Sequence, residues 1–146
     1  MIIRVATTLA EANEVIDLYL GYDRPADPRP TPLAVEESFR KINQSGYVAV
    51  AVSDNKIVGS YTMYYCANLA RSGKPFAVIE NVIIATAHRR QGIGRTLMAH
   101  AQVAARDTGC YKVMLCTGAN RPENLKFYES CGFIGNKVGF QVRYVS

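Results

Sequence analysis

The sequence predicts an α/β fold of the α+β type, with a mixed, mostly antiparallel sheet of about six to seven strands flanked by four helices. Three observations support this fold class. Apolar residues recur at helical spacing in four segments, strand-like alternation fills the segments between them, and one predicted helix joins two strands that must then run parallel. The predicted order of elements is β-α-α-β-β-β-α-β-α-β(-β).

The N-terminal part predicts one strand and two helices. Residues Ile2 to Ala6 form a short strand-like run, and apolar residues at helical spacing follow from Leu9 to Gly21. Four of the six prolines lie between Tyr22 and Pro32, which predicts an extended loop rather than a linker between domains. A second helix is expected from Thr31 or Pro32 to about Gln44.

The middle of the chain predicts a hairpin, a central strand and a third helix. Tyr47 to Val52 and Ile57 to Cys66 flank turn residues, which is typical of a β-hairpin. After a polar loop, Phe76 to Ala85 is apolar on both faces and therefore predicts a strand that is covered on both sides. Gly92 to Asp107 then predicts an amphipathic helix that ends at Gly109.

The C-terminal part predicts one more strand, a fourth helix and a final strand pair. Lys112 to Cys116 is expected to be the strand, Arg121 to Cys131 the helix, and Phe133 to Val145 the strand pair. We expect residues 1–146 to form a single domain, because this length suits one compact hydrophobic core.

Composition argues against several classes of protein. No apolar run approaches the roughly 20 residues that span a bilayer, and the N-terminus has no uninterrupted signal-peptide core. The four cysteines show no CxxC spacing, so we expect neither a metal site nor a disulfide framework. These features predict a cytoplasmic protein without a metal. The formal net charge of +5 favours anionic partners, although mild basicity alone is common in soluble domains.

The segment from Ala87 to Thr96 predicts a helix start that binds an anion. Gly92 and Gly94 open a helix directly after the central strand, where first-turn N–H groups and the helix dipole favour negative charge. The three cations of this segment are Arg89, Arg90 and Arg95. A diphosphate fits this chemistry. The alternative is a tight glycine turn beneath a basic surface. The sequence does not match a dinucleotide-binding motif, because the third glycine is missing, nor a P-loop, because GK[ST] is missing.

Two motifs of this chain carry a resemblance to a known family. The run Arg89-x-x-Gly92-x-Gly94 follows a long central strand, and Phe127-Tyr128-Glu129-x-x-Gly132-Phe133 lies downstream. Together they resemble the GNAT superfamily of acyl-CoA-dependent N-acyltransferases: the first motif is similar to its acyl-CoA signature, and the second to its other marker, an aromatic-Tyr-Glu-x-x-Gly-Phe sequence. The element order matches as well, so the resemblance covers nearly the whole chain and implies the acyl-CoA N-acyltransferase fold.

The resemblance implies acetyl-CoA as co-substrate, held largely by the backbone. Val82, Ile83 and Ile84 would pair with the pantetheine arm as an added strand would. Asn120 is a further candidate contact, because family members often carry Asn at the next position, here Arg121; the alternative is that Asn120 caps the following helix. The residues expected to bind the pyrophosphate are Arg89, Arg90, Gln91, Gly92, Ile93, Gly94 and Arg95.

Two residues are candidates for proton transfer. An amine at neutral pH is mostly ammonium, so a base must accept a proton before attack. Glu80 lies in an apolar strand, and we expect partial burial to raise its pKa toward working pH; the alternative is a structural ion pair. The resemblance places Tyr128 near the thioester sulfur as acid for the leaving thiolate, whereas packing beside Leu125 is the alternative. A backbone N–H near Val82 would hold the oxyanion.

The sequence therefore predicts an N-acetyltransferase that moves acetyl from acetyl-CoA to the primary amine of an unidentified small molecule or peptide, by direct attack in a ternary complex. The acceptor is expected between the segment Tyr22–Pro32 and the strand end Tyr61–Tyr65. Tyr22 and Asp23 are candidate contacts. Alternatives are a non-catalytic acetyl-CoA-binding module and a basic nucleic-acid binder, although no aromatic and basic interleaving is present. We expect no nucleic-acid or membrane partner, and the resemblance allows a homodimer.

Overall fold

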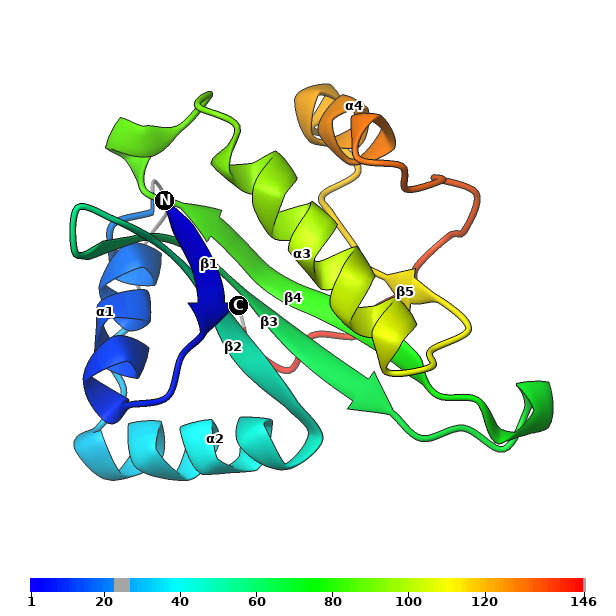
Figure 1. Cartoon of the computed structure of the whole chain (residues 1–146), viewed down its shortest axis with the longest axis horizontal. Coiled ribbons are helices and arrows are strands. Elements are labelled where there is room, and N and C mark those ends of the chain that lie inside the picture. The colour runs from blue at the N-terminus through cyan, green and yellow to red at the C-terminus, as the bar shows by residue number, and fades with distance from the viewer. Residues whose placement is uncertain (23–26, 146) are drawn as a thin grey trace. The chain divides into compact units, whose positions relative to one another are not determined.

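A computed structural model describes residues 1–22 and 27–145, which divide into two compact units. The first unit, Met1–Met114, contains a five-stranded sheet and three α-helices among its described residues (Figure 1). The second unit, from Leu115 onward, contains helix α4 (Pro122–Ser130). No α-helix within the described residues is both long and apolar enough to cross a membrane.

The sheet follows the order of the chain, with neighbouring strands antiparallel until the last pair. Its last two strands run parallel, as the sequence predicts, because α3 carries the chain back between them. The strands are β1 (Ile2–Val5), β2 (Gly46–Ser53), β3 (Lys56–Cys66), β4 (Phe76–Ile84) and β5 (Val113–Met114).

Helices cover both faces of this sheet. Figure 1 shows α1 and α2 on one side and α3 on the other. The helices are α1 (Leu9–Leu20), α2 (Pro32–Ser45) and α3 (Ile93–Asp107), and short 3₁₀ turns occupy η1 (Arg71–Gly73) and η2 (Thr86–His88). All three α-helices begin and end within two residues of the predicted positions, because their apolar spacing marks them clearly.

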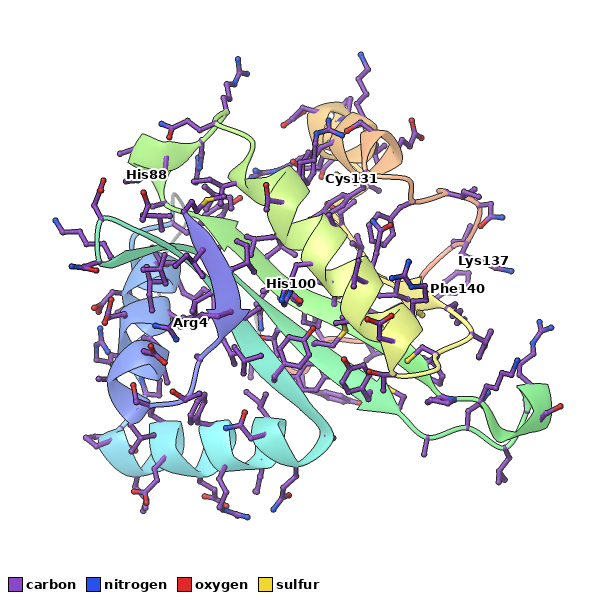
Figure 2. All side chains as sticks on the ribbon, viewed as in Figure 1. Arg4, His88, His100, Cys131, Lys137 and Phe140 are labelled. Carbon is purple, nitrogen blue, oxygen red and sulfur yellow. The ribbon has the colours of Figure 1, made fainter. Side chains whose placement is uncertain are left out.

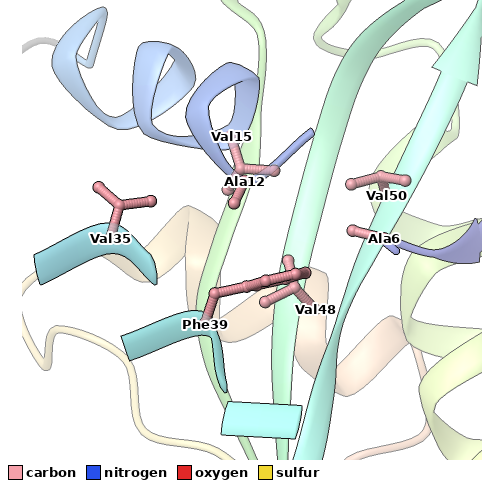
Figure 3. Close-up of a cluster of buried hydrophobic side chains, with 7 residues drawn as sticks. All are labelled: Ala6, Ala12, Val15, Val35, Phe39, Val48 and Val50. Carbon is pink, nitrogen blue, oxygen red and sulfur yellow. The ribbon is translucent and has the colours of Figure 1, made fainter. Parts of the chain in front are cut away.

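One hydrophobic core joins α1 and α2 to the sheet (Figure 3). Val15 of α1 and Phe39 of α2 are buried against Val48 and Val50 of β2. Since alternate residues of a strand point to opposite faces, Val48, Val50 and their cross-strand partners mark the face that these two helices cover. This assignment of faces decides which side chains can meet in the site described below.

The predicted strand pair from Phe133 to Val145 is wrong, since the described residues of this segment form no strand. The alternation that favoured strands is present, but apolar side chains of this segment are almost fully exposed, as Phe140 and Tyr144 are at 94% each. A strand exists through hydrogen bonds to a neighbour, which an alternating pattern alone cannot supply. The strand predicted at Lys112–Cys116 likewise shortens to β5, so the sheet has five described strands.

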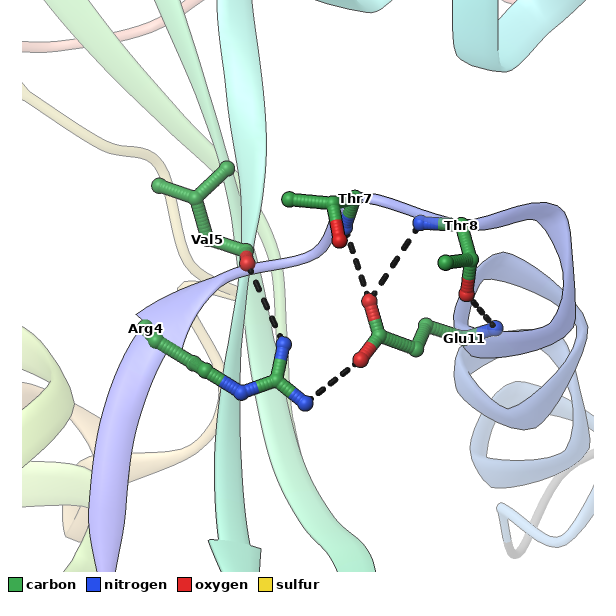
Figure 4. Close-up of polar contacts among 5 residues, drawn as sticks. All are labelled: Arg4, Val5, Thr7, Thr8 and Glu11. Carbon is green, nitrogen blue, oxygen red and sulfur yellow. Dashed lines mark hydrogen bonds and ion pairs between the residues drawn. The ribbon is translucent and has the colours of Figure 1, made fainter.

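A charged capping box fixes the start of α1 (Figure 4). The Thr8 hydroxyl accepts a hydrogen bond from the Glu11 N–H at 3.2 Å, while the Glu11 carboxylate accepts from the Thr7 and Thr8 N–H groups. Arg4 of β1 donates to the same carboxylate. The Arg4 hydrogen bond, followed by that of Thr7, lowers the pKa of Glu11 below its ordinary value of 4.5.

The capping box predicts a pH-dependent effect of Glu11→Gln. A carboxylate whose pKa is lower in the folded state stabilises the fold fully above its unfolded pKa, and this contribution is lost as pH falls through the folded pKa. The variant should therefore unfold at lower urea concentration than wild type at neutral pH, and the difference should shrink as the pH falls below 4.5. A difference that stays constant across this range would contradict the assignment.

Thr8→Ala is the matched control for that experiment. It removes the uncharged half of the same capping box, and we expect a loss of about 1 kcal/mol in the free energy of unfolding. Because a hydroxyl does not titrate in the acidic range, this loss should persist at low pH while that of Glu11→Gln fades.

Candidate active site

The candidate site is organised around a β-bulge in β4. Between the cross-strand pairs Thr62–Glu80 and Ser60–Ile83, β4 carries one residue more than β3. Asn81 accommodates the extra length with a backbone φ of 54°, in the left-handed region that Asn tolerates better than most residues. Such a bulge bends a strand and redirects its side chains, so the part of β4 beyond Glu80 departs from the regular sheet.

Beyond the bulge, one edge of β4 is open. β5 pairs with β4 at Ala77 and Val78, and no described residues pair with that edge from Val82 to Ile84. On the opposite edge, Ile83 and Ile84 remain bonded to β3. The three predicted pantetheine contacts thus lie along a strand edge where no described strand pairs, and of their carbonyls that of Ile84 accepts a hydrogen bond from Arg89.

The chain then enters a glycine-opened helix, as the sequence predicts. Gly92 has a φ of 83° and stands at the N-cap of α3, and the first helical hydrogen bond runs from the Thr96 N–H to its carbonyl oxygen at 3.1 Å. No side chain caps this end and no acidic residue lies in the first turn. The amides of Ile93 and Gly94 therefore start a helix dipole that no first-turn carboxylate neutralises.

Cations surround the same helix start. Arg90 adopts a left-handed φ of 61°, and Arg90 and Arg95 are exposed. Arg89 reaches back across the loop: its guanidinium lies 5.5 Å from the centre of the Tyr22 ring, and its Nε donates to the Ile84 carbonyl at 3.4 Å. Before them, the buried His88 Nδ1 has no hydrogen-bond partner within the part of the chain described (Figure 2). The loop is thus a cationic, amide-rich turn suited to a phosphate group.

Glu80 differs from its prediction in one respect: the side chain is exposed rather than partly buried. It pairs across the strands with Thr62, and therefore lies on the face that α1 and α2 cover. Burial, and after it the negative charge of Glu80, raises the pKa of the neighbouring Tyr64. The adjacent Ile79 misled the prediction, because Ile79 is buried on the opposite face whereas Glu80 is exposed at the bulge.

A cavity of about 330 Å³ lies on the same face of the first unit. Its walls come from α1, α2, residues 27–30 and the sheet, and Thr62 and Asn81 form its end at the bulge. The cavity is therefore adjacent to Glu80 in the sheet register. Part of the predicted acceptor wall, Pro28 and Pro30, does line it, whereas Asp23 lies outside the described residues.

Hydroxyl groups gather at the bulge end of this cavity. Tyr19 of α1 and Thr62 of β3 both line the cavity, and burial raises the pKa of Tyr19, so this phenol stays protonated. Ser60 is fully buried and also donates to the Ala49 carbonyl at 2.8 Å. Sequence reasoning missed these residues, because Tyr19 is one apolar position of a helix until the sheet register brings Thr62 beneath it.

On the opposite face, a buried network holds the strand beneath the bulge. The Tyr61 hydroxyl lies 2.8 Å from the Tyr47 hydroxyl and 2.8 Å from Nδ1 of His100, which projects from α3 (Figure 2). Burial raises the pKa of Tyr61, raises that of Tyr47 to about 12, and lowers that of His100. His100 therefore connects α3 to the sheet.

The second unit contains the remaining predicted site residues. Tyr128 lies in α4 with its ring 5.0 Å from that of Phe127 and 6.1 Å from that of Phe133, centre to centre. The alternative assignment of Asn120 as a helix cap is wrong: Arg121 occupies the N-cap, and no side chain bonds there. Among the residues that the structure describes, no group of three or more His, Cys, Asp or Glu could hold a metal ion.

The comparison with protein families decides the family. The model of the acetyltransferase (GNAT) family matches residues 12–133, which include Glu80, the glycine-opened helix and Tyr128. The chain belongs to the GNAT acetyltransferase family. The resemblance stated from the two motifs is thereby confirmed, and so is the fold class, with fewer strands than predicted.

Individual relatives of this GNAT chain support the same fold. A solved structure from Agrobacterium tumefaciens str. C58, described as a "putative acetyltransferase", is 37% identical with a TM-score of 0.89, over 98% of this chain and 99% of that one. A transcriptional regulator from Bacillus halodurans C-125 is 28% identical with a TM-score of 0.83, over 98% and 99%. Glucosamine 6-phosphate N-acetyltransferase of Trypanosoma brucei brucei is 33% identical over 78 residues, which are 53% of this chain and 51% of that protein. The chain spans about half the length of the curated relatives it matches.

The buried network predicts a stability effect for Tyr61→Phe. Removal of this hydroxyl leaves both Tyr47 and His100 without their shared partner, so we expect a loss of about 1–3 kcal/mol in the free energy of unfolding, measured by urea denaturation. Tyr111→Phe, which removes the hydroxyl of an exposed tyrosine, should change stability by less than about 0.5 kcal/mol. Equal effects of both variants would show that the network does not hold β3 to α3.

Proposed function

We propose that this GNAT protein is an acetyl-CoA-dependent N-acetyltransferase that acts on a primary amine by direct attack in a ternary complex. One observation carries the proposal. A single strand supplies a carboxylate at Glu80, a bulge at Asn81 and an open edge from Val82 to Ile84, and then leads straight into the cationic helix start at Gly92. In this order, the carboxylate suits the amine, the bulge suits the thioester carbonyl, and the open edge and the helix start suit the extended arm and the diphosphate of the donor.

The residues after the bulge suit acetyl-CoA. The open edge of β4 offers N–H and C=O groups to the amide bonds of a pantetheine arm, and the helix start offers its amides and arginines to the diphosphate. A Cβ on Gly92 would meet no protein atom within 4 Å, so the space above this backbone is open to a ligand. In our proposal the contacts are Val82, Ile83, Ile84 and the residues from Arg89 to Arg95, with Asn120 as a further candidate.

Glu80 is the proposed base. Its exposed carboxylate, on the cavity side of the sheet, can take a proton from an ammonium group directly or through a water molecule. The amine lone pair then attacks the thioester carbonyl carbon, and in our proposal a backbone N–H near Val82 stabilises the oxyanion. When the carbon–sulfur bond breaks, the leaving thiolate takes a proton from the Tyr128 hydroxyl. The nitrogen loses its second proton to solvent, which reprotonates Tyr128, and the acetyl group remains on nitrogen as a neutral amide.

The proposed base and acid predict a large loss of turnover in Glu80→Gln and Tyr128→Phe. Each group should contribute about 10²–10⁴-fold to the rate, measured as release of free CoA thiol with a panel of amines. Neither variant should change the calorimetric affinity for acetyl-CoA by much, because the donor is held elsewhere. Glu36→Gln, an exposed carboxylate of α2, should keep full activity. Full turnover in both site variants would overturn the proposed roles of Glu80 and Tyr128, and binding without transfer in wild type would favour a non-catalytic acetyl-CoA-binding module.

The helix start predicts that Gly92→Ala weakens acetyl-CoA binding. Gly109 gives a matched control, because its φ of 86° is nearly that of Gly92 at 83°, and a methyl group at either position would meet no protein atom within 4 Å. Both alanine variants should lose about 1–2 kcal/mol of stability through the left-handed backbone. Only Gly92→Ala should raise the acetyl-CoA dissociation constant, by about tenfold to a hundredfold. Equal affinities of the two variants would place the diphosphate elsewhere.

A further inference from the structure

The cavity beneath α1 and α2 carries a single charge among its described lining residues, and that charge is negative. Asp27 is the charged residue, and the described lining holds no Lys, Arg or His. Arg29, two residues further on, does not line the cavity and forms an ion pair with Asp17 and a hydrogen bond with Asn13. The described walls therefore attract a cation and offer no cationic partner to an anion.

The body of the cavity is apolar. Eleven of the sixteen described lining residues have apolar side chains, with Val15, Phe39 and Val48 among the most deeply buried. A volume of about 330 Å³ is at the small end of the range for ligand sites, which runs from about 300 to 1,000 Å³. The space therefore suits a small molecule that gains affinity by burying hydrocarbon rather than sugar hydroxyls.

Two polar residues of the cavity lie at the bulge, Thr62 and Asn81, and Tyr19 of α1 contributes a further hydroxyl to the lining. Glu80 pairs with Thr62 across the strands on the same face. An amine that enters with its nitrogen toward these hydroxyls thus approaches the carboxylate that we propose as base.

We propose that the acceptor is a small primary amine with an apolar body and no phosphate, bound in this cavity with its nitrogen toward Thr62 and Glu80. The role of this amine as acceptor rests on the proposed acetyl transfer. Its binding in the cavity does not depend on that transfer. The proposal separates this chain from the glucosamine 6-phosphate N-acetyltransferases that it resembles over about half their length. A phosphate ester carries nearly two negative charges and requires arginine or lysine partners, which the described lining lacks.

The first experiment compares three probes: 2-phenylethylamine, glucosamine and glucosamine 6-phosphate. Binding is measured by calorimetry in the presence of CoA, and transfer by release of CoA thiol with acetyl-CoA. We expect 2-phenylethylamine to bind best and glucosamine 6-phosphate to bind at least about a hundredfold more weakly, because its phosphate would be desolvated without a partner. Preferential binding or acetylation of glucosamine 6-phosphate would overturn the proposal while leaving acetyl transfer intact.

Two variants, each with a matched control, test whether the amine binds in the cavity. Asp27→Asn should raise the KM for 2-phenylethylamine by about two- to fivefold at constant kcat, because an exposed charge contributes modestly to attraction. Asp54→Asn, which removes the same charge from the β2–β3 turn, should leave KM unchanged. Ala34→Phe should fill the wall of the cavity and raise KM by about tenfold or more, whereas Ala10→Phe, on the exposed surface of α1, should not.

The outcomes separate the two proposals. Binding of 2-phenylethylamine that responds to Ala34→Phe, without thiol release from any amine, would support the cavity ligand and overturn acetyl transfer. If thiol is released with amines whose KM is unchanged in both Asp27→Asn and Ala34→Phe, acetyl transfer would be supported and the cavity would be overturned as the acceptor site. Absence of binding by 2-phenylethylamine at millimolar concentration, while acetyl-CoA binds normally, would also overturn the acceptor proposal.

Discussion

The extra residue at Asn81 is the constraint on which the candidate site depends. Without it, β4 would continue in register with β3, and its far edge would be a regular strand available to β5 along its whole length. With it, Asn81 adopts a left-handed backbone and lines the cavity, and the rest of β4 pairs with β3 one residue out of the earlier register. One inserted residue thus gives the site its irregular segment of strand.

The backbone strain of the site is concentrated in a short stretch of chain. Asn81 and Arg90 have positive φ values without being glycine, and Gly92 follows in the same left-handed region. Such conformations persist only where surrounding packing determines them. Here the packing comes from both faces: Tyr61 with its hydroxyl partners lies beneath the bulge on the α3 side, and Ser60 and Thr62 are buried on the other. The rigid sheet therefore supports the irregular segment that the chemistry requires.

Local sequence patterns predicted most of the fold, whereas the features that depend on pairing between distant segments were not predicted. The helices and the first hairpin follow from residue spacing within each segment, so their bounds agree closely with the structure. The bulge depends on how β4 pairs with β3, which lies earlier in the chain, and no spacing in β4 reveals it. The exposure of Glu80 was mispredicted for the same reason. In the C-terminal segment, alternation around Phe140 predicted strands that lack a partner to pair with among the described residues.

Donor and acceptor are recognised by different parts of the chain in our proposal, and this division bears on how relatives can differ. The proposed contacts to acetyl-CoA come mainly from backbone amides, which many side chains can supply once Gly92 and the bulge are in place. The acceptor cavity is built from side chains of α1, α2 and residues 27–30, which project over the sheet from elements earlier in the chain. Substitutions there change charge and volume without disturbing the helix start. In our proposal, this chain can therefore bind the same donor as relatives named for a sugar phosphate, while its acceptor cavity, which has no cation among its described residues, takes a different amine.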